Sequence, residues 1–165
     1  MAMFKIQLGD LPELQAFLEE RIYEYNAAVT GYRDAEVFSA IRAGESGEIE
    51  AGIYGYTWGG CCVVTHLWVS AHLRGRGLGA ALLDEVERHA RHRRCYIVFL
   101  SSHSFQAPDF YVRRGYTPLA RVRDCPVGHS DIHYAKRLDA PWLETAVPKQ
   151  ATGMADCSCW IPSGK

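Results

Sequence analysis

The 165-residue sequence has no long apolar run, almost no net charge, and no internal repeat or low-complexity segment. A membrane-spanning helix needs about 18 or more consecutive apolar residues, so none is expected. The first ten residues, MAMFKIQLGD, lack the basic and then apolar regions of a secretory signal, and we therefore expect a cytoplasmic protein without a membrane partner. A formal net charge of -1 argues against the broad basic surface that nucleic acid requires.

The six cysteines follow no regular spacing, which argues against a disulfide framework. Cys61, Cys62 and Cys95 lie in or beside apolar runs typical of buried strands, and we predict that they are reduced structural thiols. Cys157 and Cys159 have no second Cys or His pair at ligand spacing. No metal is therefore expected.

Length and composition suit one soluble domain, with 48% hydrophobic and 22% charged residues. The composition changes after Leu138, where the chain loses its apolar period and gains several Pro and Gly residues. We predict a folded domain at residues 1–139 and a poorly structured C-terminal tail at residues 140–165.

Apolar periodicity predicts the element order β-α-β-β-β-α-β-α-β-β, with Asp10 as the N-cap of the first helix. The turn signals at 44–47 and 59–60 indicate that the second, third and fourth strands form consecutive antiparallel hairpins. Residues 26–36 suggest a loop or a broken second helix. The expected strands span 4–8, 37–43, 49–58, 61–69, 96–100, 116–122 and 131–138, and the expected helices span 11–26, about 80–92 and 107–114.

A glycine-rich loop, Arg74-Gly75-Arg76-Gly77-Leu78-Gly79, follows the strand that ends at Val69 and precedes a helix. Glycines without Cβ atoms let the backbone turn with positive φ and approach a ligand closely. The first amides of a helix have no intrahelical partner, and the helix dipole favours an anion there. The loop therefore predicts a phosphate-binding site.

Gly75, Gly77 and Ala80 formally satisfy the dinucleotide fingerprint G-x-G-x-x-A. That fingerprint follows its strand immediately and expects an acidic residue about twenty positions further on. Here residues 70–74 intervene, and Ser101 and Ser102 stand near the expected acid. The three preceding strands in hairpin order also disagree with a first βα unit.

Arg74, Gly77 and Gly79 also fit a second pattern, Arg/Gln-x-x-Gly-x-Gly/Ala, and a later motif reads Phe110-Tyr111-x-x-x-Gly115-Tyr116. With the strand ending Leu67-Trp68-Val69 and the element order, residues 4–138 resemble the GNAT superfamily of acetyl-CoA-dependent N-acetyltransferases. The resemblance implies an α/β fold with a mixed, mostly antiparallel seven-stranded sheet flanked by helices. It also implies direct acetyl transfer from acetyl-CoA to a primary amine in a ternary complex, and a possible homodimer.

The resemblance assigns roles to residues at matching positions. The Leu67 carbonyl and the Val69 amide should pair with the pantetheine arm of acetyl-CoA, and the Val69 amide is also a candidate oxyanion donor. Tyr111 should protonate the departing thiolate, and Ser104 stands where many members carry an Asn that contacts the arm. The pyrophosphate should be held by the backbone amides of Arg76, Gly77, Gly79 and Ala80, with Arg74 at the first place of the motif.

The general base is not at its usual place, because Val63 stands where many family members carry a Glu. Strand alternation predicts that His66 lies on the face opposite Val63. His103 follows a strand end near the expected cleft, so it ranks above His66. The other substitutes are Glu48, Glu50, Asp109 or an ordered water.

The acceptor amine is left open by the sequence. Aromatic residues such as Tyr54, Tyr56 and Trp58 could form a wall for it, and Asp131 could attract a cation. The acceptor could be a polyamine, an amino-acid derivative or an amine-bearing antibiotic. A protein N-acetyltransferase and a non-catalytic acyl-CoA-binding module or sensor are the alternatives.

Overall fold

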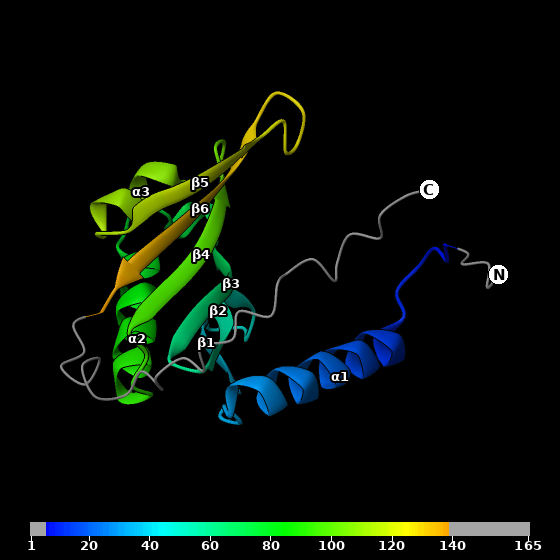
Figure 1. The fold of residues 1–165 in the computed structure, drawn as a ribbon. Helices are drawn as coiled ribbons and strands as arrows, with labels where there is room; N and C mark the ends of the chain where they lie inside the picture. Colours follow the sequence, from blue (N-terminus) through cyan, green and yellow to red (C-terminus); the bar gives the residue numbers. More distant parts are fainter. Residues whose placement is uncertain (1–5, 139–165) are drawn as a thin grey trace.

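A six-stranded mixed sheet forms the centre of the computed structural model, which describes residues 6–138 (Figure 1). The strands lie in the order β1-β2-β3-β4-β6-β5, with β3 and β4 parallel and all other neighbours antiparallel. This confirms the predicted α/β fold. The elements are α1 (Pro12–Thr30), β1 (Glu36–Ala43), β2 (Ile49–Trp58), β3 (Cys61–Val69), the 3₁₀ turn η1 (Ala71–Leu73), α2 (Leu78–His92), β4 (Ile97–His103), α3 (Pro108–Arg113), β5 (Thr117–Arg123) and β6 (Ser130–Arg137).

Within residues 6–138 the sheet has six strands, one fewer than the seven predicted. Residues 6–8 are exposed and form no strand, while residues 4 and 5 lie outside the described part of the chain. An alternating pattern makes a segment compatible with a strand, but a strand also needs a partner edge for its backbone groups. The predicted tail at 140–165 also lies outside the described residues.

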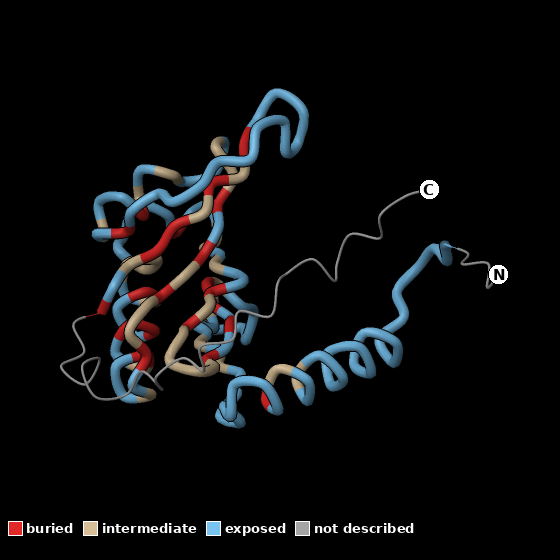
Figure 2. The backbone as a smooth tube through the Cα atoms, viewed as in Figure 1, coloured by how far each residue is buried: buried red, intermediate tan, exposed pale blue. Residues whose placement is uncertain are grey.

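Helix α1 projects away from the sheet and is longer than predicted (Figures 1 and 2). It continues through Asn26 and ends at Gly31, which adopts the left-handed conformation with φ 77° and donates its amide to the Ala27 carbonyl. The predicted Asp10 cap is wrong. Leu11 is the N-cap, and its apolar side chain makes no cap bond. The helix starts there because the fixed φ of Pro12 suits the first helical position.

A β-bulge interrupts the pairing of β2 with β3. Tyr54 pairs with His66 and Gly55 pairs with Val64, so Thr65 is an extra residue on β3. The extra residue reverses the alternation of side chains along the second half of β3. Gly55 makes this approach possible, because a Cβ at that position would lie 2.1 Å from the Val63 carbonyl oxygen.

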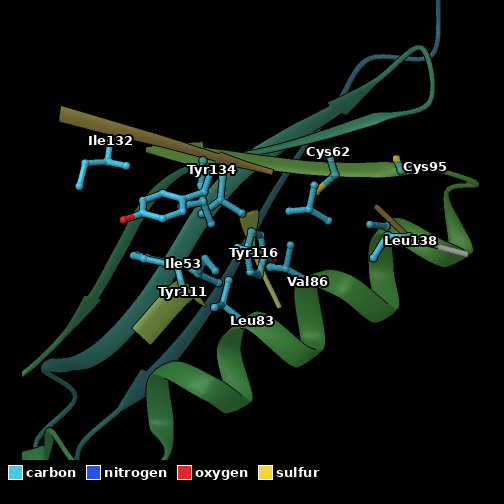
Figure 3. Packing of buried hydrophobic residues seen from close by; sticks show 14 residues of the cluster. Ile53, Cys62, Leu83, Val86, Cys95, Tyr111, Tyr116, Ile132, Tyr134 and Leu138 are labelled. Atoms are coloured by element: carbon cyan, nitrogen blue, oxygen red, sulfur yellow. The ribbon is translucent and has the colours of Figure 1, made fainter. Parts of the chain in front are cut away.

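Helices α2 and α3 pack on the same face of the sheet and form the core with it (Figure 3). Leu83 and Val86 of α2 and Tyr111 of α3 belong to one buried cluster with strand residues of β2, β3, β4 and β6. We call the opposite side of the sheet the open face. From the strand register, the side chains on it include Tyr54, Tyr56, Val63, His66, Trp68, Phe99, His103, Asp131 and His133.

The cysteines of the described residues are free thiols, as predicted for Cys61, Cys62 and Cys95. Cys62 and Cys95 are buried in the core cluster. Burial raises the pKa of the Cys62 thiol to about 12 and that of Cys95 to about 11. Both thiols are therefore protonated at neutral pH and poor nucleophiles. The predictions for Cys157 and Cys159 lie outside the described residues.

Candidate active site

The N-terminus of α2 presents unpaired backbone donors. Gly77 is the N-cap, in the left-handed conformation with φ 84°, and it supplies no side chain to cap the helix. The first intrahelical bond runs from the Ala81 amide to the Gly77 carbonyl, at 2.9 Å. The amides of Leu78, Gly79 and Ala80 are therefore without an intrahelical acceptor and lie where the helix dipole favours an anion. Leu78 was missing from the sequence prediction because α2 begins two residues earlier than expected.

Gly79 lies where the loop, the end of β3 and α3 come together. A Cβ at Gly79 would lie 3.5 Å from Cζ of Phe110 and 3.8 Å from Cδ2 of Leu67. Three segments that are distant in the sequence, and that carry the three motifs, therefore meet at one place. Both distances are ordinary van der Waals contacts, so the fold itself would accept a small side chain at this position.

The parallel strands β3 and β4 separate beside this junction. Their pairing runs from Cys61 with Ile97 to Val64 with Leu100 and ends there, although both strands continue. The second half of β3 therefore has a backbone edge that β4 does not pair with. This is the edge on which the sequence analysis places the pantetheine arm.

The backbone of β3 points the predicted groups toward this edge. The Ser70 amide donates to the Glu50 carbonyl of β2 at 2.8 Å. Because successive residues of a strand direct their backbone groups to opposite sides, the amides and carbonyls of Leu67 and Val69 point away from β2. Arg74 lies at the same edge, where its Nε donates to the Val69 carbonyl at 3.0 Å. Arg76 is exposed at the start of the loop.

Tyr111 lies in α3, where its ring is buried. Its centroid is 5.6 Å from that of Tyr134 and 6.1 Å from that of Tyr116. Burial, and to a lesser extent the neighbouring Tyr134 phenol, raises the pKa of Tyr111 above its ordinary value. The phenol is therefore protonated at neutral pH, as a proton donor must be.

Ser104 follows the end of β4 and connects it to the start of β6. Its amide donates to the Ser130 carbonyl at 2.8 Å, and its hydroxyl accepts from the Ser130 amide at 3.1 Å. The hydroxyl proton is still available for a further acceptor.

The acidic candidates for the general base have other partners or stand apart. Glu50 accepts a 2.9 Å bond from Nε of Arg42, and Glu48 accepts from the Ser46 hydroxyl. Asp109 is exposed in the first turn of α3.

The predicted position of His66 relative to Val63 is wrong. Val63 pairs with Tyr56 and His66 pairs with Tyr54, so the bulge places both side chains on the open face. The Nδ1 atom of His66 lies 3.0 Å from the Thr65 hydroxyl, and its ring contacts the edge of Tyr54.

His103, Asp131 and His133 form a cluster on the open face, near the end of β4. His103 and Asp131 are direct partners across β4 and β6. The Oδ1 atom of Asp131 is 4.0 Å from Nδ1 of His103, and its Oδ2 atom is 3.4 Å from Nε2 of His133. The rings stack on aromatic neighbours, His103 on Phe105 and His133 on Phe99. His103 and Asp131 are separate candidates in the sequence, and the pairing of β4 with β6 brings them together.

No group of three or more His, Cys, Asp or Glu side chains within residues 6–138 is arranged to hold a metal ion. No helix in the same range is long and apolar enough to cross a membrane.

The fold therefore brings a helix end with unpaired amides beside an edge of β3 that β4 does not pair with. The sequence profile of the acetyltransferase (GNAT) family matches residues 2–116. The chain belongs to this family and is an acetyltransferase.

Similar proteins agree with this assignment. Blasticidin-S acetyltransferase of Streptomyces morookaense is 37% identical over 133 residues, which cover 78% of this chain and 98% of that protein. Acetyltransferase Atu2258 of Agrobacterium fabrum is 26% identical, over 79% of this chain and 97% of that protein. The crystal structure of an acetyltransferase from Bacillus cereus has a TM-score of 0.67 and 33% identity, and the match covers 84% of this chain and all of that one.

Proposed function

We propose that this protein transfers the acetyl group of acetyl-CoA directly to a primary amine of a small molecule, and that the acceptor is an antibiotic of the blasticidin S kind. The observation that carries the choice of acceptor is the 37% identity to blasticidin-S acetyltransferase, which extends over 98% of that relative. The similarity therefore extends well beyond the glycine loop alone.

The donor side of this proposal rests on the unpaired groups at the α2 and β3 ends. The amides of Leu78, Gly79 and Ala80 suit the pyrophosphate, and the free edge at Leu67 and Val69 suits an extended, peptide-like arm. The Val69 amide would stabilise the negative charge on the thioester oxygen, and Tyr111 would protonate the departing sulfur.

The acceptor side rests on the open face. Helices α2 and α3 occupy the other face, so an amine can reach the gap between β3 and β4 from the open face. Tyr54, Tyr56 and Trp68 are 47%, 41% and 50% exposed there. Half-exposed aromatic rings on β2 and β3, with the Asp131 carboxylate of β6 on the same face, suit a flat or cationic amine.

The test is an acetylation assay with the full chain, acetyl-CoA and a panel of blasticidin S, a polyamine, an amino-acid amide and a peptide with a free amino terminus. Free thiol and the mass of each amine are measured, with amine-free reactions as the control. We expect amine-dependent thiol release and a singly acetylated product, fastest with blasticidin S. Binding of acetyl-CoA without any amine-dependent thiol would instead indicate a non-catalytic module, and acetylation of the peptide alone would indicate a protein N-acetyltransferase.

A further inference from the structure

His103 lies level with the part of β3 that should hold the donor arm. The last paired residues of the two parallel strands are Val64 and Leu100. Three residues further on, β3 has reached Leu67 and β4 has reached His103. Both strands advance by about 3.3 Å per residue, so the backbones of Leu67 and His103 lie at nearly the same level on the two sides of the gap. The extra residue of the bulge shifts this level by about one residue.

The environment of His103 resembles that of a histidine held for proton transfer. Its Nδ1 atom is shielded from solvent and faces Oδ1 of Asp131 at 4.0 Å, although the side chain as a whole is 35% exposed. The exposed part of the ring is therefore the edge away from Asp131, which carries Nε2. Stacking on Phe105, with centroids 5.2 Å apart and ring planes 12° apart, fixes the plane of the imidazole.

The open face is also the face on which family resemblance places a base. Val63, at the position where many members carry a Glu, points to this face because it lies two residues before the bulge. Val63 pairs with Phe99 of β4, and His103 lies four residues further along that strand, so His103 reaches the open face nearer the open end of the gap. His66 shares the face, but its contacts are with the Thr65 hydroxyl and the Tyr54 ring rather than with a carboxylate.

We infer that His103 accepts the proton of the attacking amine and that Asp131 is its positioning residue; this rests on the proposed acetyl transfer. The amine lone pair forms the new C–N bond, and the C–S bond breaks with its electron pair going to sulfur. The proton leaving nitrogen goes to Nε2 of His103, and sulfur takes a proton from Tyr111. Loss of the imidazolium proton to solvent and reprotonation of the phenol restore the enzyme.

Nδ1 of His103 and Oδ1 of Asp131 are buried 4.0 Å apart without a hydrogen-bond partner among the described residues, so Asp131 acts on the imidazole through its charge. A carboxylate facing Nδ1 favours the proton on that nitrogen and leaves Nε2 free to accept another. The second oxygen of Asp131 faces Nε2 of His133 at 3.4 Å, and His133 is stacked on Phe99.

The kinetic test compares His103→Gln, Asp131→Asn and His66→Gln with the wild type, using the amine acetylated fastest. His129→Gln is the matched control, because His129 meets the edge of the same Phe105 ring on which His103 stacks. We expect His103→Gln to lower kcat by about 10² or more with an unchanged Kd for acetyl-CoA, and Asp131→Asn to have a smaller effect. Added imidazole should partly restore the turnover of His103→Ala.

A second measurement needs no substrate. In long-range ¹⁵N NMR of the wild type, His103 should show the tautomer protonated at Nδ1. In Asp131→Asn the proportion of this tautomer should fall.

The possible failures are distinguishable. An inactive wild type would overturn the proposed function and the role of His103 with it. If the wild type is active, three results would overturn this inference alone. They are a kcat of His103→Gln within threefold of the wild type, a larger loss of kcat in His66→Gln, and an unchanged His103 tautomer in Asp131→Asn.

Discussion

Lys136 of β6 donates two hydrogen bonds of 2.7 Å to the two carboxylate oxygens of Glu87. Glu87 is only 4% exposed, in the middle of α2, and Arg91 lies 3.7 Å from the same carboxylate. The ion pair fastens α2 to the sheet. Because the N-terminus of α2 carries the proposed phosphate site, this pair supports the site from a distance.

Lys136→Met should therefore destabilise the protein. Removing one partner leaves the Glu87 carboxylate buried with a single distant cation, which costs about 3 kcal/mol in the free energy of unfolding. Urea unfolding followed by circular dichroism measures the loss. The double variant Glu87→Gln/Lys136→Met should recover part of it, and equal losses in the single and double variants would contradict this explanation.

Gly79→Asp should abolish acetyl-CoA binding, while Gly79→Ala should fold normally. An aspartate places a carboxylate beside the helix amides that we assign to the pyrophosphate, and like charges repel. The alanine Cβ meets Phe110 and Leu67 at ordinary distances, so it costs the fold nothing by contact. Calorimetric titration gives the affinities and thermal unfolding gives the stability. A Gly79→Asp variant that binds as tightly as the wild type would place the phosphate site elsewhere.

Tyr111→Phe should lower kcat by about 10² or more and change the Kd for acetyl-CoA little, since it removes a proton donor and keeps the ring. Burial raises the pKa of Tyr111 above 10.0, so the wild type should show no loss of rate from this group below about pH 10. Tyr116→Phe is the matched control, because it removes a phenol from the same cluster. Parallel changes in kcat and Kd would assign Tyr111 to packing.

Alkaline pH should destabilise the protein through its buried thiols. The pKa of Cys62 is raised from 9.0 to about 12, so the folded state keeps its proton where the unfolded state loses it. The unfolded state then binds fewer protons, and the free energy of unfolding falls as the pH rises from 9 toward 12, by up to about 1.4 kcal/mol per pH unit for each such group. Urea titrations of the wild type and Cys62→Ala at pH 8, 9.5 and 11 measure this slope. Equal slopes would exclude Cys62 as the cause.

The regular parts of the fold could be predicted from the sequence because they depend on neighbouring residues. The bounds of β2 and β3 match the prediction, since alternation and the Gly59-Gly60 turn are local signals. The start of α2 was placed two residues late, because Leu78 and Gly79 were assigned to the loop. Helix α1 was predicted to end near Asn26, but it continues to Thr30 and ends at Gly31, which adopts a positive φ.

The candidate site was predicted in part, for a similar reason. The glycine loop and Tyr111 lie in contiguous motifs, whereas the meeting of His103 with Asp131 depends on the register of β4 against β6. The orientation of His66 depends on the bulge at Thr65. One local signal for that bulge was present, because Gly55 lies inside a strand and leaves room for the close approach of another backbone.

The bulge at Thr65 makes the length of β3 matter as much as its residue types. Deleting this one residue would let His66 follow Val64 directly, so regular pairing would be restored while His66 stays on the open face and Leu67 stays on the core face. A substitution at Thr65 would leave the residue count, and therefore the bulge, unchanged. Insertion and deletion scanning through residues 64–67 would thus expose a requirement that replacing residues one at a time does not detect.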